Sequence, residues 1–121
     1  MNEPDELLHI ALPDDWAAAR DAGEYRVSTR GRSLDDVGFI HCSYPRQIEA
    51  VANRFFADVS ELVLLHLEPD LIEAEVRVEP AADGGDEEFP HVYGPIPRTA
   101  VLATTWWDRD DDGMWHKPTT M

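Results

Sequence analysis

The sequence predicts a single compact α+β domain with a mainly antiparallel sheet and two or three helices. Its 121 residues, 43% of them hydrophobic, suffice for one domain with its own core. Segments with strand patterns outnumber those with helical patterns, and the helical patterns come early in the chain, as is typical of the α+β class. We expect the domain to occupy residues 1–105 and an acidic, tryptophan-containing tail to occupy residues 106–121.

Two strands and a helix are expected in the first third of the chain. Residues 6–11 (ELLHIA) have the length and apolar character of a strand. Pro13 and the two acidic residues after it favour a helix start, and Gly23 favours a left-handed helix end. Residues 25–37 are polar and show no periodicity, so we expect a loop there. Residues 38–43 (GFIHCS) predict the second strand.

The clearest helical pattern covers residues 48–59. Its apolar residues recur at i, i+3, i+4, i+7, i+8 and i+11, which places them in one continuous stripe on a helix. We expect all of them, both phenylalanines included, to lie in the core rather than against a ligand. They are Ile48, Val51, Ala52, Phe55, Phe56 and Val59.

Four more strands are expected downstream. Residues 62–67 (LVLLHL) are mostly apolar and predict a central strand. Residues 74–78 alternate between apolar and charged side chains, which predicts one buried and one exposed face. The other two strands are residues 89–93 and 100–106, and glycines and prolines predict turns at 83–86 and 94–97.

The charge distribution limits the partners of the protein. With 25 acidic and 10 basic residues the net charge is -15 at pH 7, and an acidic surface repels phosphate backbones, so we expect no broad nucleic-acid binding. Residues 20–54 differ, because six basic and five acidic side chains leave them at +1 and the rest of the chain at -16. A small anionic molecule or nucleotide is expected near this stretch, unless its arginines reflect compositional bias alone.

Neither membrane contact nor a metal site is expected. No apolar run approaches the roughly 18 residues of a membrane span, and the N-terminal residues lack the features of a signal peptide, so we expect a cytoplasmic protein. The single cysteine, Cys42, follows Phe39 and Ile40 and is expected to be a buried, unreactive thiol. His41 and Cys42 are adjacent and point to opposite faces of a strand, which disfavours a shared metal ion.

The tail contains a partial calcium-binding pattern. Asp108, Asp110, Asp112 and Gly113 match the beginning of a calcium loop, but Thr119 stands where a bidentate glutamate is needed. We therefore expect the tail to be held to the body of the domain by its tryptophans, which are Trp106, Trp107 and Trp115.

Three histidines stand in distinctive short segments: His9 in LLHIA, His41 in GFIHCS and His91 in FPHVYGP. A histidine in a strand is commonly a structural residue bonded to a backbone carbonyl. The functional hypothesis requires instead that these three rings converge on one cavity. His66 is expected in the core and His116 at the surface.

The segment FPHVYGPIP is the most structured motif. Its prolines and glycine predict a rigid turn, and His91 and Tyr93, two apart on a strand, point to the same face. This arrangement suits a binding pocket or an ordinary strand end. Just before it, Glu87 and Glu88 offer carboxylates near the same strand, or form a solvated acidic loop.

Several of these segments carry a family resemblance. LLHIA, GFIHCS, VANRFF and FPHVYGPIPRTAV, with the spacing of DDW and GEY, resemble the small bacterial proteins called domain of unknown function 952, from about Leu7 to about Ala103. The resemblance implies a distant link to the ADP-ribosyltransferase superfamily. It thus implies a split antiparallel sheet that binds NAD in the cleft between its halves.

The resemblance also implies roles for individual residues. His9 matches the first-strand histidine that contacts the adenosine ribose, and stacking against nicotinamide falls to His41 or Tyr93. The glutamate that orients the nicotinamide ribose is Glu87 or Glu88. The remaining binding residues expected on this basis are Ser43 and His91, with Arg20, Arg26, Arg30 or Arg32 meeting the pyrophosphate.

Two functions follow as expectations. The first is an NAD-utilising ADP-ribosyltransferase-like enzyme that acts at the nicotinamide–ribose bond, with Glu87, Glu88 and His41 as catalytic residues. The alternative is a non-catalytic module that binds a small anion or nucleotide in a degenerate site.

Overall fold

Two three-stranded antiparallel sheets, joined at one point, organise the fold in a computed structural model that describes residues 6–81 and 85–118. The first sheet contains β1 (Leu7–Ala11), β6 (Glu61–Leu67) and β10 (Val101–Asp108), with β6 in the middle. The central position of β6 confirms the prediction made from its apolar sequence. The predicted boundary between residues 105 and 106 falls inside β10.

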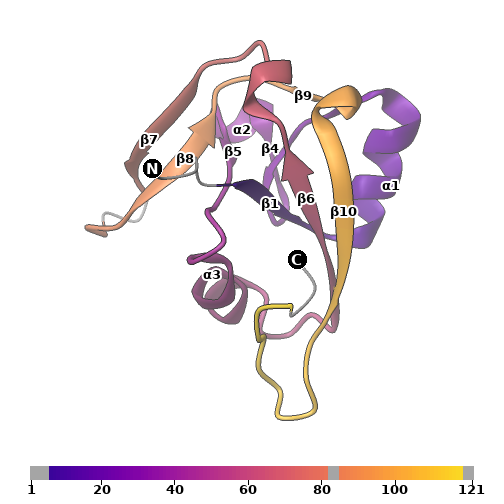
Figure 1. The fold of residues 1–121 in the computed structure, drawn as a ribbon, viewed down its shortest axis with the longest axis vertical. Helices are drawn as coiled ribbons and strands as arrows, with labels where there is room; N and C mark the ends of the chain where they lie inside the picture. The colour runs from indigo at the N-terminus through magenta and orange to yellow at the C-terminus, as the bar shows by residue number, and fades with distance from the viewer. Residues whose placement is uncertain (1–5, 82–84, 119–121) are drawn as a thin grey trace, which may run out of the picture.

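The second sheet contains β5 (Ile40–His41), β8 (Glu88–Val92) and β7 (Val76–Pro80), in the order β5-β8-β7. A single antiparallel bridge between Leu8 and Ser43 links β1 to the chain after β5. Away from this bridge the two sheets diverge, as Figure 1 shows. The α+β class and the split antiparallel sheet predicted from the sequence are therefore confirmed.

The described residues contain three α-helices, α1 (Pro13–Ala22), α2 (Leu34–Val37) and α3 (Ile48–Phe55), and two short 3₁₀ turns, η1 (Pro69–Leu71) and η2 (Arg98–Ala100). α1 begins at Pro13 and is capped by Gly23, whose φ of +90° is left-handed and whose N–H donates to the Ala19 carbonyl at 2.8 Å. Both ends agree with the sequence prediction, because proline fits the first turn of a helix and glycine fits its left-handed end.

The prediction of a loop over residues 25–37 is wrong. This stretch takes part in β2 (Glu24–Tyr25) and contains β3 (Val27–Thr29), β4 (Arg32–Ser33) and α2. β2 pairs with β9 (Ile96–Pro97), which lies in the turn expected at 94–97. Strands of two or three residues show no periodicity, and β2 in addition depends on a partner far along the chain. The expected strand 38–43 is likewise reduced to Ile40–His41.

Helix α3 ends at Phe55 rather than continuing to Val59. Ile48, Val51 and Ala52 are buried, but Phe55 is 47% exposed while its neighbour Phe56 is buried. Adjacent residues at a helix end point in different directions, so the expectation that both phenylalanines lie in the core is wrong for Phe55. The turn expected at 83–86 falls partly outside the described residues.

Both faces of the first sheet carry hydrophobic cores. Leu7, Val63 and Leu65 on one face belong to a core that includes Ile40 and Val92 of the second sheet. On the other face, Leu8, Ile10, Leu62 and Leu64 pack with residues from α3 and the tail, including Ile48, Val51, Trp107 and Trp115. The tail is thus held by two of its three tryptophans, whereas Trp106 is 54% exposed.

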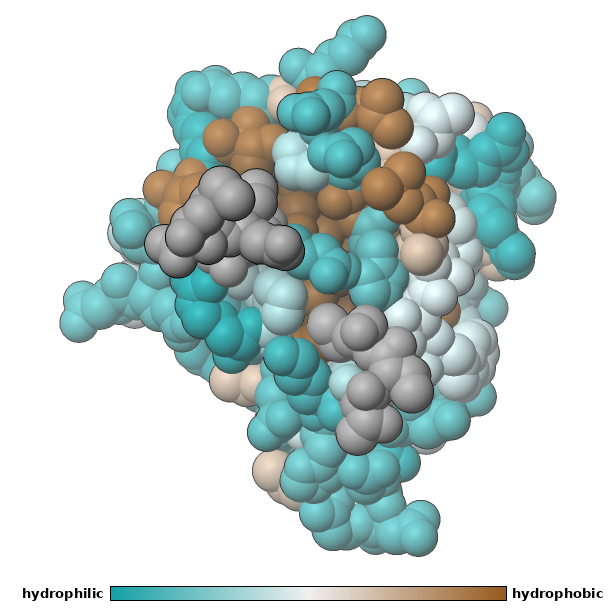
Figure 2. Space-filling view, viewed as in Figure 1, coloured by the Kyte–Doolittle hydropathy of each residue, from teal (hydrophilic) through white to brown (hydrophobic). Residues whose placement is uncertain are grey.

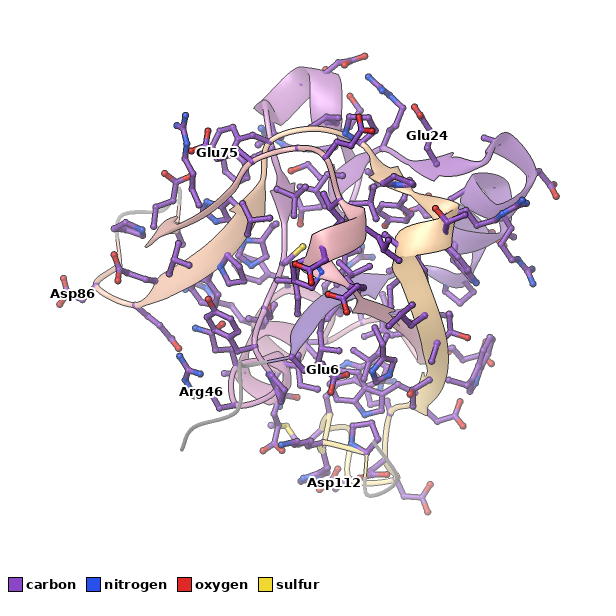
Figure 3. All side chains as sticks on the ribbon, turned by 45° about the horizontal axis from the view of Figure 1, so that its top comes forward. Glu6, Glu24, Arg46, Glu75, Asp86 and Asp112 are labelled. Atoms are coloured by element: carbon purple, nitrogen blue, oxygen red, sulfur yellow. The ribbon has the colours of Figure 1, made fainter. Side chains whose placement is uncertain are left out.

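Acidic side chains are spread over the outside of the molecule. Figure 3 shows Glu24, Glu75, Asp86 and Asp112 projecting from separate parts of the ribbon. In Figure 2 most of the visible face is hydrophilic, and hydrophobic residues gather in its upper middle part. No helix among the described residues is long and apolar enough to cross a membrane.

Candidate functional site

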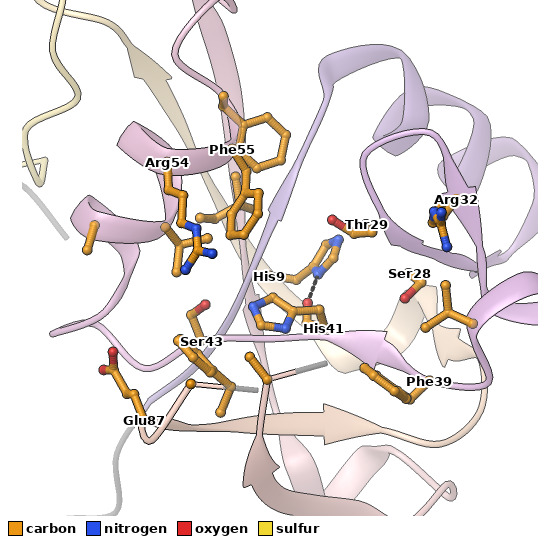
Figure 4. A pocket seen from close by; sticks show the side chains of 18 of the residues that line it. His9, Ser28, Thr29, Arg32, Phe39, His41, Ser43, Arg54, Phe55 and Glu87 are labelled. Carbon is orange, nitrogen blue, oxygen red and sulfur yellow. Dashed lines mark hydrogen bonds between the residues drawn. The ribbon is translucent and has the colours of Figure 1, made fainter. Parts of the chain in front are cut away.

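A cavity of about 490 Å³ lies where the two sheets diverge. Its walls include His9 in β1, His41 in β5, the β3–β4 hairpin, helix α3 and the segment that leads into β8, with Glu87 (Figure 4). The volume is in the range of pockets that hold small molecules. We call this cavity the central pocket.

His9 has both ring nitrogens engaged inside the protein. Nδ1 bonds to the carbonyl oxygen of His41 at 2.6 Å, and Nε2 to the Tyr25 hydroxyl at 2.9 Å. Because a carbonyl only accepts, Nδ1 carries the hydrogen, and Nε2 accepts from Tyr25. Burial lowers the pKa of His9 from 6.5 to about 4, although the bond to His41 partly offsets this. His9 is therefore a neutral imidazole at pH 7 with a fixed orientation.

The β3–β4 hairpin forms one side of the central pocket. Val27 pairs with Ser33 and Thr29 with Arg32, so Ser28 is the extra residue of a β-bulge. A bulge breaks the alternation of side chains along a strand. Ser28 and its neighbour Thr29 consequently both line the pocket, together with Arg32.

The tip of this hairpin is tied to the end of α3. Arg30 donates to both carboxylate oxygens of Asp58, at 2.6 and 2.8 Å, and to the carbonyl of Phe55 at 3.2 Å. The two-pronged geometry suits an arginine–carboxylate pair. Arg30 is therefore committed to holding the wall of the pocket and does not line it.

The side opposite the hairpin carries Arg54 of α3 and Glu87, as Figure 4 shows. Buried Gln47 donates to Glu87 Oε2 at 3.0 Å and to the Glu88 carbonyl at 2.8 Å. Gln47 thereby holds the Glu87 carboxylate at the pocket edge. Aromatic rings of Phe39, Phe55 and Phe89 are among the lining residues.

The structure brings together five of the residues expected from the sequence to form a site: His9, Arg32, His41, Ser43 and Glu87 all line the central pocket. The other expected residues do not line it; they are Arg20, Arg26, Arg30, Glu88, His91 and Tyr93. Arg26 is paired with Glu24 and Asp35 on the surface, and Arg20 lies over the Trp16 ring at 6.0 Å.

The expected convergence of three imidazoles on one cavity is incorrect, because His91 lies behind the pocket wall. Its ring stacks on Phe39 at a centroid distance of 4.1 Å, and its Nδ1–H donates to Glu79 at 2.9 Å. The Tyr93 hydroxyl donates to the same carboxylate oxygen. His91 and Tyr93 do share a face, as predicted, but Phe39 separates His91 from the cavity that His41 lines.

The remaining candidate groups, Cys42, His66 and His116, lie outside the central pocket. Cys42 is 1% exposed, and burial raises the pKa of its thiol, in agreement with the predicted inert cysteine. His66, expected in the core, is partly buried and bonds to Glu6 and Thr105, and His116 is exposed beside Asp112. The described residues contain no group of three or more His, Cys, Asp or Glu able to hold a metal.

Residues 10–104 match the family described as "Protein of unknown function (DUF952)". The chain belongs to the DUF952 family.

A solved structure with the same architecture is that of protein CC0527 from Caulobacter crescentus. Its crystal structure gives a TM-score of 0.77 at 28% identity, over 92% of this chain and 93% of that one. Its solution NMR structure gives 0.73 at 30% identity, over 92% and 91%. No curated protein matches. None of these matches points to the ADP-ribosyltransferase superfamily. The expected link to that superfamily rests on the resemblance of the sequence motifs alone.

The pocket of this DUF952 protein includes residues that sequence reasoning missed. Ser28 and Thr29 were hidden in the supposed loop, and Arg54 and Phe55 in a helix assigned to the core. A readable signal existed for the first pair. Ser33 and Asp36 form a capping box and Gly38 caps α2 with φ of +98°, and this sequence pattern predicts a helix start inside the supposed loop.

Proposed function

We propose that the central pocket binds a small anionic nucleotide, with NAD as the candidate, and that the protein acts on its nicotinamide–ribose bond. The observation that carries this proposal is the joint presence of Arg32, Arg54 and His41 with aromatic rings in one cavity of suitable volume. Phosphate groups need cationic forks, and flat rings of a nucleotide need apolar faces.

Charge supports the choice of an anionic ligand. The pocket lining has two arginines, balanced by Asp86 and Glu87, whereas the whole chain carries -15. The pocket is therefore far less negative than the rest of the molecule, and its two arginines come from opposite sides. An anionic ligand that also carries flat rings matches this combination of arginines and aromatic side chains.

Of the two expected glutamates, Glu87 is the one available for chemistry, because Gln47 holds it at the pocket edge and Glu88 does not line the pocket. The bond between ribose C1′ and the nicotinamide nitrogen would break, with its electron pair leaving on neutral nicotinamide. The positive charge left on the ribose would be stabilised by Glu87. An acceptor, water in the simplest case, would then attack C1′ and release a proton.

A second candidate is a module that binds a nucleotide without chemistry. Both nitrogens of His9 are already bonded within the protein, so His9 would have to give up Tyr25 before it could contact a ribose hydroxyl. A site with fixed internal bonds can recognise a ligand by shape and charge and still lack turnover.

Calorimetry with NAD, followed by an assay of nicotinamide release, tests these proposals. We expect binding in the micromolar to millimolar range and slow release of nicotinamide by the wild type. Glu87→Gln should abolish release and retain binding, and Glu88→Gln, its matched control outside the pocket, should retain both. The absence of both heat and a thermal shift at millimolar NAD would refute the binding proposal; saturable binding without release would leave the second candidate.

A further inference from the structure

The hydroxyl of Ser28 is a buried polar group without a partner. The residue is 1% exposed, and its Oγ makes no hydrogen bond. Burying a hydroxyl without a hydrogen bond costs stability, so buried polar groups in folded proteins nearly always find a partner. Because Ser28 also lines the central pocket, a ligand in that pocket can supply the missing partner.

The local backbone explains how this hydroxyl reaches the cavity. Ser28 is the extra residue of the bulge in β3, and Thr29 follows it with its Cα opposite that of Arg32. Bulges often occur beside active sites, where they redirect a side chain. Here the bulge gives one short hairpin two adjacent hydroxyls on the pocket side.

A cation completes the group. Arg32 lines the same side of the pocket, and in Figure 4 Arg32, Ser28 and Thr29 lie together, across the pocket from Arg54. Within the part of the chain that the structure describes, the Arg32 guanidinium has no hydrogen-bond or ion-pair partner. By contrast, Arg26, which precedes this hairpin, and Arg30, at its tip, are both paired with carboxylates.

We propose that Ser28, Thr29 and Arg32 form an oxyanion subsite that holds a phosphate or pyrophosphate group of the ligand. Hydroxyl donors and a guanidinium fork are the side-chain groups that satisfy phosphate oxygens. The subsite rests on the proposed function for the identity of the rest of the ligand, but its own chemistry requires only the oxyanion. The subsite would place the phosphate group at the β3–β4 hairpin. The rest of the ligand would then extend toward Arg54 and Glu87.

Ser28→Ala separates a ligand-binding role from a structural one. Because Oγ has no partner within the protein, its removal should leave the unliganded protein as stable as the wild type or more stable. The same substitution should weaken the binding of a phosphate-bearing ligand about tenfold, since it removes a hydrogen bond to a charged group. Arg32→Gln should weaken binding by at least as much.

The experiment is calorimetry in phosphate-free buffer with inorganic pyrophosphate, ADP, adenosine and NAD as probes. Arg20→Gln is the matched control, because it removes the same charge from an exposed site outside the pocket. We expect ADP to bind more tightly than adenosine. Ser28→Ala and Arg32→Gln should weaken the binding of pyrophosphate and of ADP, while Arg20→Gln should change the affinity for either probe little.

The outcomes distinguish the two proposals. If pyrophosphate binds in a Ser28- and Arg32-dependent way but NAD does not bind, the subsite stands and the NAD proposal fails. If NAD binds equally to the wild type, Ser28→Ala and Arg32→Gln, the subsite is overturned and the proposed function survives. If none of the four probes binds, or if all three variants weaken binding equally, the subsite is overturned.

Discussion

His9 and His41 are joined by a 2.6 Å hydrogen bond from the His9 ring to the His41 main chain, across 32 residues of sequence. The bond lies next to the Leu8–Ser43 bridge, the point where the two sheets meet. The His9 side chain thereby connects β1 to β5 beside the bridge. Both histidines line the central pocket. The His9 imidazole therefore both stabilises the junction of the two sheets and forms part of the candidate site.

Acid should weaken the fold through His9. Its pKa is 6.5 in the unfolded chain and about 4 in the folded protein, where the ring is buried. Between these two pH values the unfolded chain therefore binds more protons than the folded protein does. The stability that neutral His9 contributes is fully present above pH 6.5 and is lost as the pH falls toward 4. Between pH 7 and pH 5 the free energy of unfolding should fall by about 2 kcal/mol. Urea unfolding at pH 5, 6 and 7 measures this loss.

The matched variant is His9→Asn, which keeps an N–H donor but does not titrate. It should be less stable at pH 7, because Tyr25 loses its acceptor, yet show a smaller loss of stability on acidification. The exposed His116 has a pKa raised by Asp112. Its protonation therefore stabilises the fold on acidification, opposite to His9, and it does so in both the wild type and the variant. An unchanged pH dependence in His9→Asn would show that another group is responsible.

Trp115 should be essential for stability. It is fully buried, its indole N–H donates to the Phe56 carbonyl at 2.9 Å, and Asn53 bonds to its backbone on both sides. Trp115→Ala should lower the free energy of unfolding by about 3–5 kcal/mol. Trp106→Ala removes the same side chain from an exposed position and should cost little. Equal losses in the two variants would contradict this account of the tail.

Gly94 should not tolerate a side chain. A Cβ at this position would lie 2.6 Å from the Cβ of Ala74, closer than carbon atoms can pack. Gly94→Ala should destabilise the protein by about 1–3 kcal/mol. Adding Ala74→Gly removes the clashing atom and should recover part of the loss, which thermal denaturation of the single and double variants measures. A double variant no better than Gly94→Ala would place the strain elsewhere.

Cys42 should react with a thiol reagent only when the protein opens. Its thiol is buried and its pKa is raised by burial, so little reactive thiolate is available at pH 8. We expect modification in native buffer to be at least about a hundredfold slower than in 8 M urea, at a rate that follows protein stability. Fast modification of the native protein would mean that the strand around Cys42 is open to solvent.

Local sequence patterns predict those elements whose residues repeat in register with a regular structure. The α+β class, the central strand β6, the ends of α1 at Pro13 and Gly23, and the buried Cys42 follow from apolar patterning and local backbone preferences. These signals are local, so they survive without knowledge of the partners. His9, His41 and Glu87 were also identified as site candidates, from their motifs.

Which of these groups meet in the pocket depends on how the segments pair and pack. The bulge that turns Ser28 toward the cavity depends on the pairing of β3 with β4, and the exposure of Phe55 depends on where α3 ends. His91 and His41 pair across neighbouring strands, yet one is covered by Phe39 and the other lines the pocket. Hairpin pairing and packing between segments set these differences, and the periodicity of the sequence does not encode them.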